Sequence, residues 1–380
     1  GQIDFDAKDV IRFGRIQAGG MIYFDHATGQ SYQTEEILEH LAQQRNYPTL
    51  LASARFTLQD LPDSPLEQVI NNNTFSAYSR HVAYSLNQES FKFFLDPMLE
   101  SGAEKISAMG FGLAPNVLTD EEGGMSKYFS QRFAQVTNPP LDSLRESDGM
   151  TLRVALGAKP TFSQKATLQL VLNSPILQPQ QLEQIFAQDR IKVSLIDTLF
   201  TPTINNRSDN TKRVQKALAL ICQQVEEAAA NGSGIIVLSD KLITNRQAAL
   251  PAILVAAAVN QHLIKRGHRF DTSLIYQTGQ AASSHDIACL LGFGISAICP
   301  LSVYYRAQTL ANNQSTEVGL NNFQKACEKS LMKTMGKFGL CTAESYIGGE
   351  FFESSFIDTD SPCLKDYFPN IASPVGGARL

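Results

Sequence analysis

The sequence has no apolar run long enough to cross a membrane and no cluster of basic residues. Its longest apolar run, AALPAILVAAAV at residues 248–259, falls short of the ~20 residues that a transmembrane helix needs. The net charge of the 380-residue chain is −5, which gives nucleic-acid binding little electrostatic support. Residues 1–10 are acidic and polar, unlike a signal or transit peptide. We therefore expect a cytoplasmic protein that binds neither membranes nor nucleic acids.

The sequence also lacks the spacings typical of metal, nucleotide and disulfide sites. Its six cysteines form no CxxC pair, which favours reduced thiols over a zinc site or a disulfide framework. There is no P-loop and no HExxH, and GFGLAP and GFGISA both lack the third glycine of a dinucleotide-binding turn. Ser284, His285 and Asp286 cannot form a triad on a helix, because adjacent side chains diverge by ~100°. We expect no catalytic residue and no metal ligand, and we expect His285 to cap or pack.

The N-terminal part predicts a small β/α segment. On either side of the HATG turn, successive side chains alternate between two faces as they do in short strands, and Gly29 lies in the turn. A helix over residues 34–46 follows, with Thr34 as the expected N-cap. The glycine-rich stretch 109–125 has no periodicity, so we expect a surface or interface loop there.

From Met150 onward, short apolar runs alternate with helical patterns. Such runs, nearly uncharged and mostly rich in β-branched residues, are typical of strands that helices cover on both faces. The repeated βα order predicts an α/β fold with a parallel sheet or a partial barrel and right-handed crossovers. The expected strands are residues 168–172, 192–196, 234–240, 273–279 and 295–300.

The C-terminal part begins with a basic amphipathic helix over residues 321–339. LCTAESYIGGEFFE follows, and we interpret it as a strand, a turn and a short helix. A (β/α)8 barrel takes ~250 residues, so this region has room only for a truncated start of one.

The motif LSDK, residues 238–241, places polar residues at the end of an expected strand. Open α/β sheets bind ligands at the carboxyl ends of their strands, so Asp240 is a candidate ligand group. Asp240 is equally a candidate N-cap for the next helix, and the cap is the favoured interpretation.

The stretch RFAQVTNPPLDSLRE, residues 132–146, places two prolines after a helix-like run. Pro139 and Pro140 fix their own φ angles and bias Asn138 toward an extended conformation, so they stiffen the loop. Thr137 and Asn138 add short, uncharged hydrogen-bonding groups.

Several motifs, in order along the chain, resemble the glutamate synthase large (alpha) subunit. YFSQRFAQVTNPPLDSLRE, IIVLSDK and SSHDIACLLGFGISAICP are similar to that family's central domain. GRIQAGGMIYFD resembles the exit from its amidotransferase domain, and LMKTMGKFGLCTAESYIGGEFFE resembles the start of its FMN-binding synthase domain. The resemblance covers essentially the whole chain, and stretch 109–125 departs from the pattern.

The resemblance implies three regions: the end of the amidotransferase domain and a connector (1–45), the central domain (46–310), and a connector with the truncated start of an FMN barrel (311–380). In the parent enzyme, ammonia released from glutamine crosses a tunnel to the FMN domain and reductively aminates 2-oxoglutarate to L-glutamate. We expect the present chain to link these domains, to help form the tunnel and to be inactive alone. FMN and a 3Fe-4S cluster would belong to the parent, with ferredoxin or a small subunit as electron donor, and no cofactor to this chain.

The resemblance implies a partial FMN site at the end of the chain. It assigns Lys337, Gly339 and Cys341 to the first barrel strand beside FMN, with Ser345 just after. The family pattern has methionine at Phe338, serine at Cys341 and glutamine at Glu350. The missing hydroxyl at Cys341 removes a hydrogen-bond partner for flavin or phosphate. A carboxylate at Glu350 opposes an anionic reduced flavin.

Two questions stay open at this point. A conduit for ammonia needs a fixed backbone and few charges, so the double-proline loop can form the tunnel wall or an interdomain contact, or it can be a rigid packing loop that meets no ammonia. The chain can also be a stand-alone, degenerate relative that binds a small anion or a partner without redox chemistry. The candidate tunnel or interdomain residues are Phe133, Gln135, Thr137, Asn138, Pro139 and Pro140.

Overall fold

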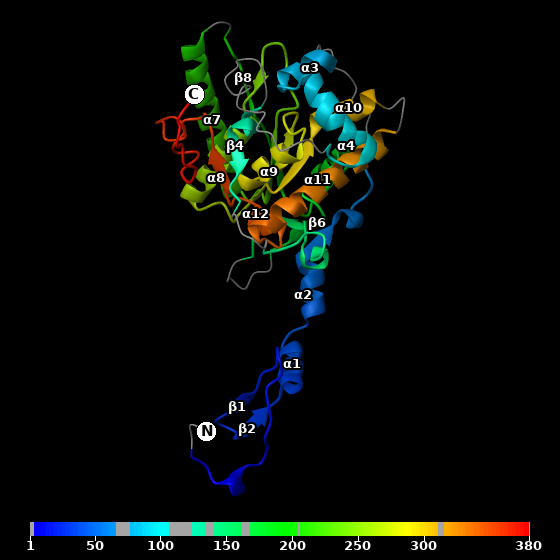
Figure 1. The fold of residues 1–380 in the computed structure, drawn as a ribbon, viewed down its shortest axis with the longest axis vertical. Helices are drawn as coiled ribbons and strands as arrows, with labels where there is room; N and C mark the ends of the chain where they lie inside the picture. Colours follow the sequence, from blue (N-terminus) through cyan, green and yellow to red (C-terminus); the bar gives the residue numbers. More distant parts are fainter. Residues whose placement is uncertain are drawn as a thin grey trace. The chain divides into compact units, whose positions relative to one another are not determined.

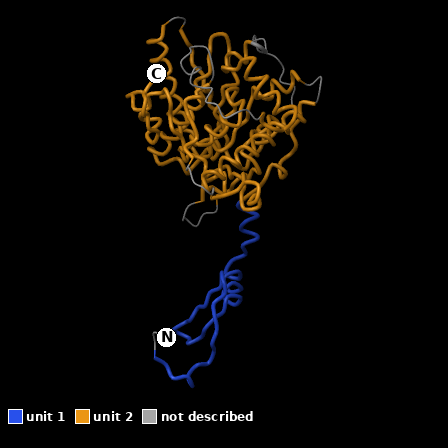
Figure 2. The backbone as a smooth tube through the Cα atoms, viewed as in Figure 1, with its two compact units in different colours: residues 1–54 blue, residues 55–380 orange. Residues whose placement is uncertain are grey.

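The computed structural model describes residues 4–65, 77–105, 124–133, 140–160, 167–203, 206–310 and 315–379. The chain forms two compact units, Gly1–Ala54 and Arg55–Leu380, which Figure 2 colours separately. The expected loop 109–125 lies almost wholly outside the described residues, and so do Gln135, Thr137, Asn138 and Pro139. The division of the chain at 45/46 and 310/311 stays a prediction about the family's domains.

The first unit contains a hairpin and two helices. Strands β1 (Tyr23–Asp25) and β2 (Gln30–Tyr32) pair antiparallel, and Gly29 in the turn between them has a φ of 69°. The hairpin at the HATG turn is therefore confirmed. Helices α1 (Thr34–Gln43) and α2 (Tyr47–Ala54) follow it.

The start of α1 differs in detail from the expectation. Thr34 is the first helical residue and not the N-cap, because its hydroxyl is hydrogen-bonded to the backbone N–H and C=O of Met21. Gln33 occupies the cap position and forms a capping box with Glu36. None of the residues that the structure describes in this unit is buried.

A four-stranded parallel sheet forms the centre of the second unit (Figure 1). Its order is β12-β11-β9-β7, so each strand pairs with its neighbour in the series. Ile176 adds a parallel bridge to Ile298 at the other edge of β12. This one-directional winding is that of a partial barrel, and the predicted α/β fold class is confirmed. The strands are β7 (Val193–Asp197), β9 (Ile235–Ser239), β11 (Ser273–Thr278) and β12 (Ala297–Pro300).

Helices enclose this sheet, which explains why β9 and β11 consist entirely of buried residues. Helix α7 packs against β7, β9 and α8, α9 packs against β12, and α10 packs against β11. Their bounds are α7 (Arg207–Ala230), α8 (Ala252–Arg266), α9 (Ser284–Gly292) and α10 (Leu301–Thr309). Gly267 ends α8 with a φ of 78°, as its position in the sequence predicts.

The first expected strand of the series belongs elsewhere. β6 (Gln169–Leu172) lies in a separate three-stranded sheet, between a parallel β3 (Arg55–Thr57) and an antiparallel β5 (Val154–Leu156). The sequence could not show this, because an apolar run of this length suits the interior of either sheet. Only the residues after β6 reach the parallel sheet, where Leu177 donates to the carbonyl of Ile298 and Ile298 donates to that of Pro175. Helix α6 (Pro179–Ala187) follows.

The C-terminal elements occur in another order than expected. Helix α11 (Thr316–Phe338) is followed by the short helix α12 (Ala343–Tyr346) and then by strand β13 (Phe352–Ser354). β13 pairs antiparallel with β4 (Phe129–Gln131) and not with a parallel barrel strand. The predicted strand at the start of this segment is wrong, because α11 continues to Phe338 and Thr342 then caps α12.

The remaining elements cover the sides of the second unit. α11 packs against α4, α9 and α10. No helix in the described ranges combines the length and the apolar character that a bilayer crossing needs. Apart from short 3-10 turns, the other elements are α3 (Ala77–Ala83), a π-helical turn (Ser90–Leu95), α4 (Asp96–Ser101), β8 (Leu199–Phe200) and β10 (Ala248–Ala249).

Candidate functional site

The double-proline loop is anchored on its N-terminal side by backbone pairing. β4 runs into the loop and pairs with β13, and the N–H of Arg132 donates to the carbonyl of Phe351 at 2.9 Å. The Tyr346 hydroxyl donates to Oε1 of Gln131 at 2.9 Å, which ties the same strand to α12. The segment that enters the loop is therefore held by the C-terminal part of the chain.

The two ends of the loop also contact the end of α11. The rings of Phe133 and Phe338 are 4.9 Å apart, and Nζ of Lys337 lies 4.7 Å from the centre of the Phe133 ring. On the far side of the loop, Pro140 packs directly against Gly339. We call this contact the proline-loop junction: Phe133 and Pro140 with Leu141 on one side, Lys337, Phe338 and Gly339 with Gly336 on the other.

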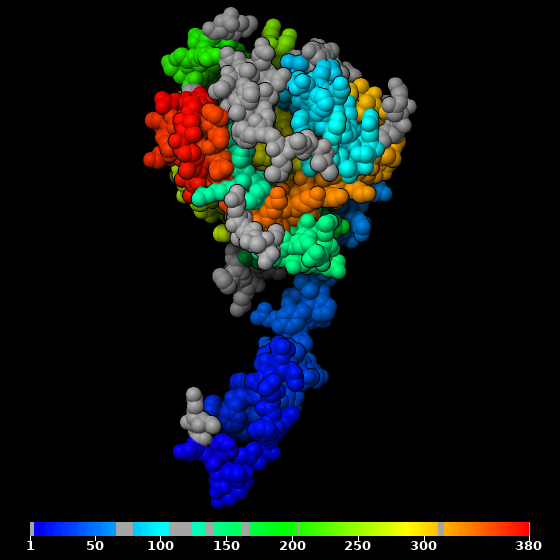
Figure 3. Space-filling model, in the orientation of Figure 1, coloured from blue at the N-terminus to red at the C-terminus, as the bar shows by residue number. Residues whose placement is uncertain are grey.

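Figure 3 shows the residues after Pro140 (spring green) beside the end of α11 (orange) on the surface of the second unit. A Cβ added to Gly336 would lie 3.3 Å from the carbonyl oxygen of Leu141, so the two backbones approach closely here. The junction thus joins two sets of residues that the sequence analysis singled out separately. Their proximity had no signal in the sequence, because they lie about 200 residues apart in the chain.

The four residues assigned to a partial FMN site are now placed. Lys337 is exposed in the last turn of α11, and Gly339 ends that helix with a φ of 73°. Cys341 is exposed, and its carbonyl accepts from the N–H of Thr151. Ser345 lies in α12, where its hydroxyl is 2.8 Å from that of Thr342. The expected barrel strand through Lys337, Gly339 and Cys341 is therefore wrong, because helix α11 ends at Phe338 with Gly339 as its cap.

These four residues contact different partners among the described residues. The FMN role of Lys337, Gly339, Cys341 and Ser345 stays a prediction about a longer protein.

Two departures from the family pattern have local structural explanations. Phe338 packs against Phe133, Tyr346 and Phe351, with ring centres 4.9 to 6.1 Å apart, so an aromatic side chain fills this position. Glu350 is buried and accepts from Nε2 of Gln261 at 2.6 Å and from Nδ2 of Asn370 at 2.7 Å. Burial raises the pKa of Glu350, and the two amide donors oppose that shift. Glu350 thus bridges α8 and the C-terminal segment.

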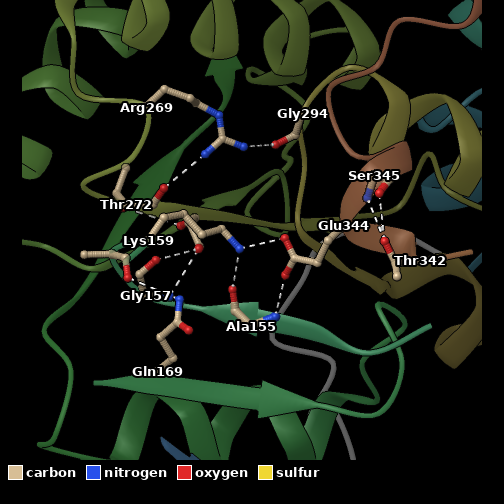
Figure 4. A network of polar contacts seen from close by, with 12 residues as sticks. Ala155, Gly157, Lys159, Gln169, Arg269, Thr272, Gly294, Thr342, Glu344 and Ser345 are labelled. Atoms are coloured by element: carbon tan, nitrogen blue, oxygen red, sulfur yellow. Dashed lines mark hydrogen bonds and ion pairs between the residues drawn. The ribbon is translucent and has the colours of Figure 1, made fainter. Parts of the chain in front are cut away.

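A polar network fixes α12 to the three-stranded sheet (Figure 4). Glu344 accepts from Nζ of Lys159 and from the backbone N–H of Ala155, both at 2.7 Å, and Lys159 also donates to the carbonyl of Ala155. Ala155 lies on β5, at the edge of that sheet, so the carboxylate satisfies a backbone donor that the ladder leaves over. The sequence analysis missed this network, because nothing in the local pattern of Lys159 pairs it with Glu344.

Asp240 is neither an open ligand group nor the N-cap of the next helix, the two interpretations that the sequence left open. Helix α8 begins at Ala252 with Pro251 at its cap, because β10 first pairs with β8, so the cap interpretation is wrong. The carboxylate of Asp240 is fully buried and accepts from the Thr278 hydroxyl (2.5 Å), the Gly279 N–H (2.9 Å) and Nε2 of Gln280 (3.2 Å). Burial raises its pKa to about 6. These partners engage both oxygens, so Asp240 organises the turn after β11.

His285 and its neighbours also have structural partners. Nε2 of His285 lies 3.0 Å from the carbonyl of Ser126, and Asp286 accepts from the hydroxyl and backbone of Ser283 in a capping box. Ser284 donates to Glu104. The Ser126 hydroxyl also donates to Asp286, so His285 and Asp286 both contact Ser126, while Ser284 contacts Glu104. No group of three or more His, Cys, Asp or Glu side chains in the described ranges is placed to hold a metal ion.

The proline-loop junction requires a residue without a side chain at position 339, which can be tested by substitution. In Gly339→Ala, the new Cβ would lie 2.9 Å from Cγ of Pro140, and the backbone would keep a left-handed φ. We expect a loss of about 2–3 kcal/mol in the free energy of unfolding, measured by urea denaturation. The matched control is Gly267→Ala, which has a φ of 78° at the same cap position but meets no atom within 4 Å. Its loss should be about 1 kcal/mol. Equal losses in the two variants would mean that the Pro140 contact is not tight.

The fold and the junction define a class of protein: an α/β domain with a parallel partial barrel and peripheral segments tied to it. Comparison with known proteins supplies the family. The family model of the glutamate synthase central domain matches residues 79–357. The chain belongs to the glutamate synthase family and contains its central domain.

Relatives from distant organisms match the chain over its full length. It is 30% identical to a ferredoxin-dependent glutamate synthase of rice, over 100% of this chain and 24% of the relative. It is 29% identical to the glutamate synthase [NADPH] large chain of Bacillus subtilis, again over 100% of this chain and 24% of the relative. The chain thus spans about a quarter of the length of these relatives. Among solved structures, a flavocytochrome b2 double mutant with pyruvate bound matches 88% of this chain and 95% of its own, with 10% identity and a TM-score of 0.37.

Proposed function

We propose that this chain is the central, non-catalytic segment of a glutamate synthase, and that it holds an amidotransferase domain and an FMN-binding synthase domain in fixed relation. The observation that carries the proposal is the proline-loop junction. There the two ends of the double-proline loop, Phe133 and Pro140, contact the end of α11, where the resemblance to the synthase domain begins. A rigid contact at this point would transmit position from one domain to the next.

The first unit supports the same proposal. Its large apolar side chains are solvent-exposed, including Ile11 at 102% and Phe13 at 95% of full accessibility, and no described residue in it is buried. A segment without a core of its own gains stability by packing against further protein. We propose that this further protein is the amidotransferase domain, whose exit the first unit resembles.

The chemistry of the whole protein follows from this assignment as a proposal. Ammonia released from L-glutamine would pass along the double-proline loop to the synthase domain, and there 2-oxoglutarate would be reductively aminated to L-glutamate. Fixed φ angles at the two prolines and short uncharged side chains beside them suit a conduit that must not protonate or lose ammonia. FMN and the iron–sulfur cluster would be held by other parts of the protein. Ferredoxin or a small subunit would supply the electrons.

The test uses the full-length protein and two ways of supplying nitrogen. In Thr137→Phe, a bulky side chain enters the proposed conduit. We expect the glutamine-dependent rate of glutamate formation to fall at least about tenfold, while the rate with added ammonium salt changes by less than about twofold. Gly339→Ala should lower the ratio of the glutamine-dependent rate to the ammonia-dependent rate, because it displaces the junction that positions the loop. Gly267→Ala is the control and should leave the ratio unchanged.

The outcomes separate the two interpretations of the loop. A selective loss of the glutamine-dependent rate supports passage of ammonia beside this loop. If both rates fall together, or neither falls, the loop is a packing element and the conduit role is lost. Full-length protein that forms no glutamate from either nitrogen source would contradict the parent reaction itself.

A further inference from the structure

A cleft of about 400 Å3 extends along β7 from Val193 to Asp197 and reaches the carboxyl ends of β9 and β11. Neither the junction nor the proposed function uses it. The carboxyl ends of parallel strands are where α/β sheets place their ligand groups. The volume is within the range of small-molecule sites, ~300–1,000 Å3. Its lining combines buried polar groups at the floor with charged and apolar side chains at the rim.

Strand register brings the polar floor of the cleft together. Asp197 on β7 pairs with Ser239 on β9, and Ser239 pairs with Gln277 on β11. Paired residues on adjacent strands point to the same face, so these three side chains form a row across the sheet. Asp240, the first residue after β9, points to the opposite face and into the core. Within the motif LSDK, Ser239 therefore faces the cleft and Asp240 faces the core.

Hydrogen bonds orient the floor of the cleft. The Ser239 hydroxyl donates to Oε1 of Gln277 at 2.8 Å and accepts from the N–H of Lys241 at 3.2 Å. Because Oε1 of Gln277 is engaged, its amide N–H group is the part available to the cleft. Both Ser239 and Gln277 are buried, so their geometry is fixed before any ligand enters.

Charges of both signs stand at the rim. Lys241 follows β9, Asp197 ends β7, and Glu183 lies on α6. Among the described residues, the side chains of these three have no hydrogen-bond or ion-pair partner. Unpaired charges of opposite sign on one small cleft match a ligand that itself carries both.

Apolar side chains complete the wall. Leu195 and Leu242 are 56% and 52% exposed, and Phe186 and Val193 line the cleft with them. Exposed leucines beside a polar floor can exchange water for an aliphatic group, which is favourable at about 25 cal/mol per Å2 of apolar area buried.

We propose that this cleft binds a zwitterionic α-amino acid with an aliphatic side chain. Lys241 and the Gln277 amide would receive the α-carboxylate, and Asp197 with Glu183 would receive the α-ammonium group. The aliphatic side chain would lie on Leu195 and Leu242. This proposal is independent of the proposed linking function, since no residue of the cleft belongs to the proline-loop junction.

The test is binding by isothermal titration calorimetry on the 380-residue chain, with L-leucine as the probe. Isocaproate, which lacks the ammonium group, and isoamylamine, which lacks the carboxylate, are the matched ligands. We expect both to bind at least about tenfold more weakly than L-leucine, because isocaproate leaves the acidic side chains of the rim unpaired and isoamylamine leaves Lys241 unpaired. Lys241→Met and Asp197→Asn should each weaken L-leucine binding at least about tenfold. Lys329→Met, an exposed lysine on α11, is the control and should leave it unchanged.

Several results would overturn the proposal. L-leucine gives saturable heat only if the chain has a site for it, so absence of binding by L-leucine, L-valine and L-methionine rejects the proposal. Equal affinity for L-leucine and isocaproate would identify a simple anion site instead. Unchanged binding in Lys241→Met or Asp197→Asn would place the ligand elsewhere. Circular dichroism of each variant checks that it folds. We expect both variants to fold, because Asp197 is exposed, Lys241 is half-buried, and neither side chain has a partner among the described residues.

Discussion

Gly294→Ala should be among the most damaging single substitutions in the chain, with an expected loss of about 3–5 kcal/mol in the free energy of unfolding. Gly294 follows α9 with a φ of 102°, a conformation that alanine adopts only with strain. A Cβ there would lie 2.4 Å from Cγ of Asn260, which is buried on α8. Asn260 accepts from Nε of Arg269 at 2.7 Å, so moving it also disrupts the Arg269 fork that reaches Thr272 and Gly294 (Figure 4).

Urea denaturation followed by circular dichroism measures this loss. The matched control is Gly232→Ala, which keeps a φ of 81° but meets no atom within 4 Å. It should lose only about 1 kcal/mol, the cost of the backbone conformation alone. Arg269→Met in a double-variant cycle with Gly294→Ala tests the route of the damage: non-additive losses are expected if the two share Asn260. Similar losses in Gly294→Ala and Gly232→Ala would refute the close contact with Asn260.

Asp240 should make the stability of the fold depend on pH between about 4 and 7. Its folded-state pKa, about 6, lies above the ordinary 3.8 because the carboxyl is fully buried. A raised pKa means that the proton stabilises the folded state. The contribution is therefore complete below the ordinary pKa and is lost as the pH rises through about 6. The shift corresponds to roughly 3 kcal/mol between the two ends of this window.

The measurement is the free energy of unfolding at a series of pH values, for the unmodified chain and for Asp240→Asn. We expect the difference between the two proteins to change by roughly 3 kcal/mol across the window, because asparagine does not titrate. Asp189→Asn, at an exposed carboxylate, should run parallel to the unmodified chain. Asp240→Ala should show the same change with pH, because alanine does not titrate either, and it should cost about 2–4 kcal/mol at the high-pH end of the window, since it leaves the Thr278 hydroxyl and the Gly279 N–H buried without their acceptor. Parallel curves for the unmodified chain and Asp240→Asn would contradict the burial of this carboxyl.

The strands of the central sheet could be predicted because a strand that is buried on both faces appears in the sequence as a short, uncharged, apolar run. IIVLS in β9 and SLIYQT in β11 are uncharged runs, and both proved to be buried throughout. The equally apolar run of β6 was placed in the wrong sheet, because its composition records burial but not the identity of its partner strands.

The proline-loop junction likewise has one feature that the sequence predicts and others that only packing decides. The stiffness of the double-proline loop follows from the covalent geometry of proline, which acts within one residue. The contact of Phe133 with Phe338, and of Pro140 with Gly339, depends on how β4 and α11 pack. The FMN residues were misplaced on a strand because family resemblance gives a motif and not its conformation. Here Gly339 and the Thr342 cap divide that motif between two helices.

By itself, the sequence determined the alternation of strands and helices, the hairpin at Gly29 and the family, since each depends on residues that are close together in the chain. The tertiary structure alone decided that Asp240 turns into the core while Ser239 and Lys241 border a cleft, and that the proline loop meets α11. The reason is physical: a side chain's own chemistry fixes what it can bond to, but its partner is chosen by long-range packing that brings distant segments within a few ångströms.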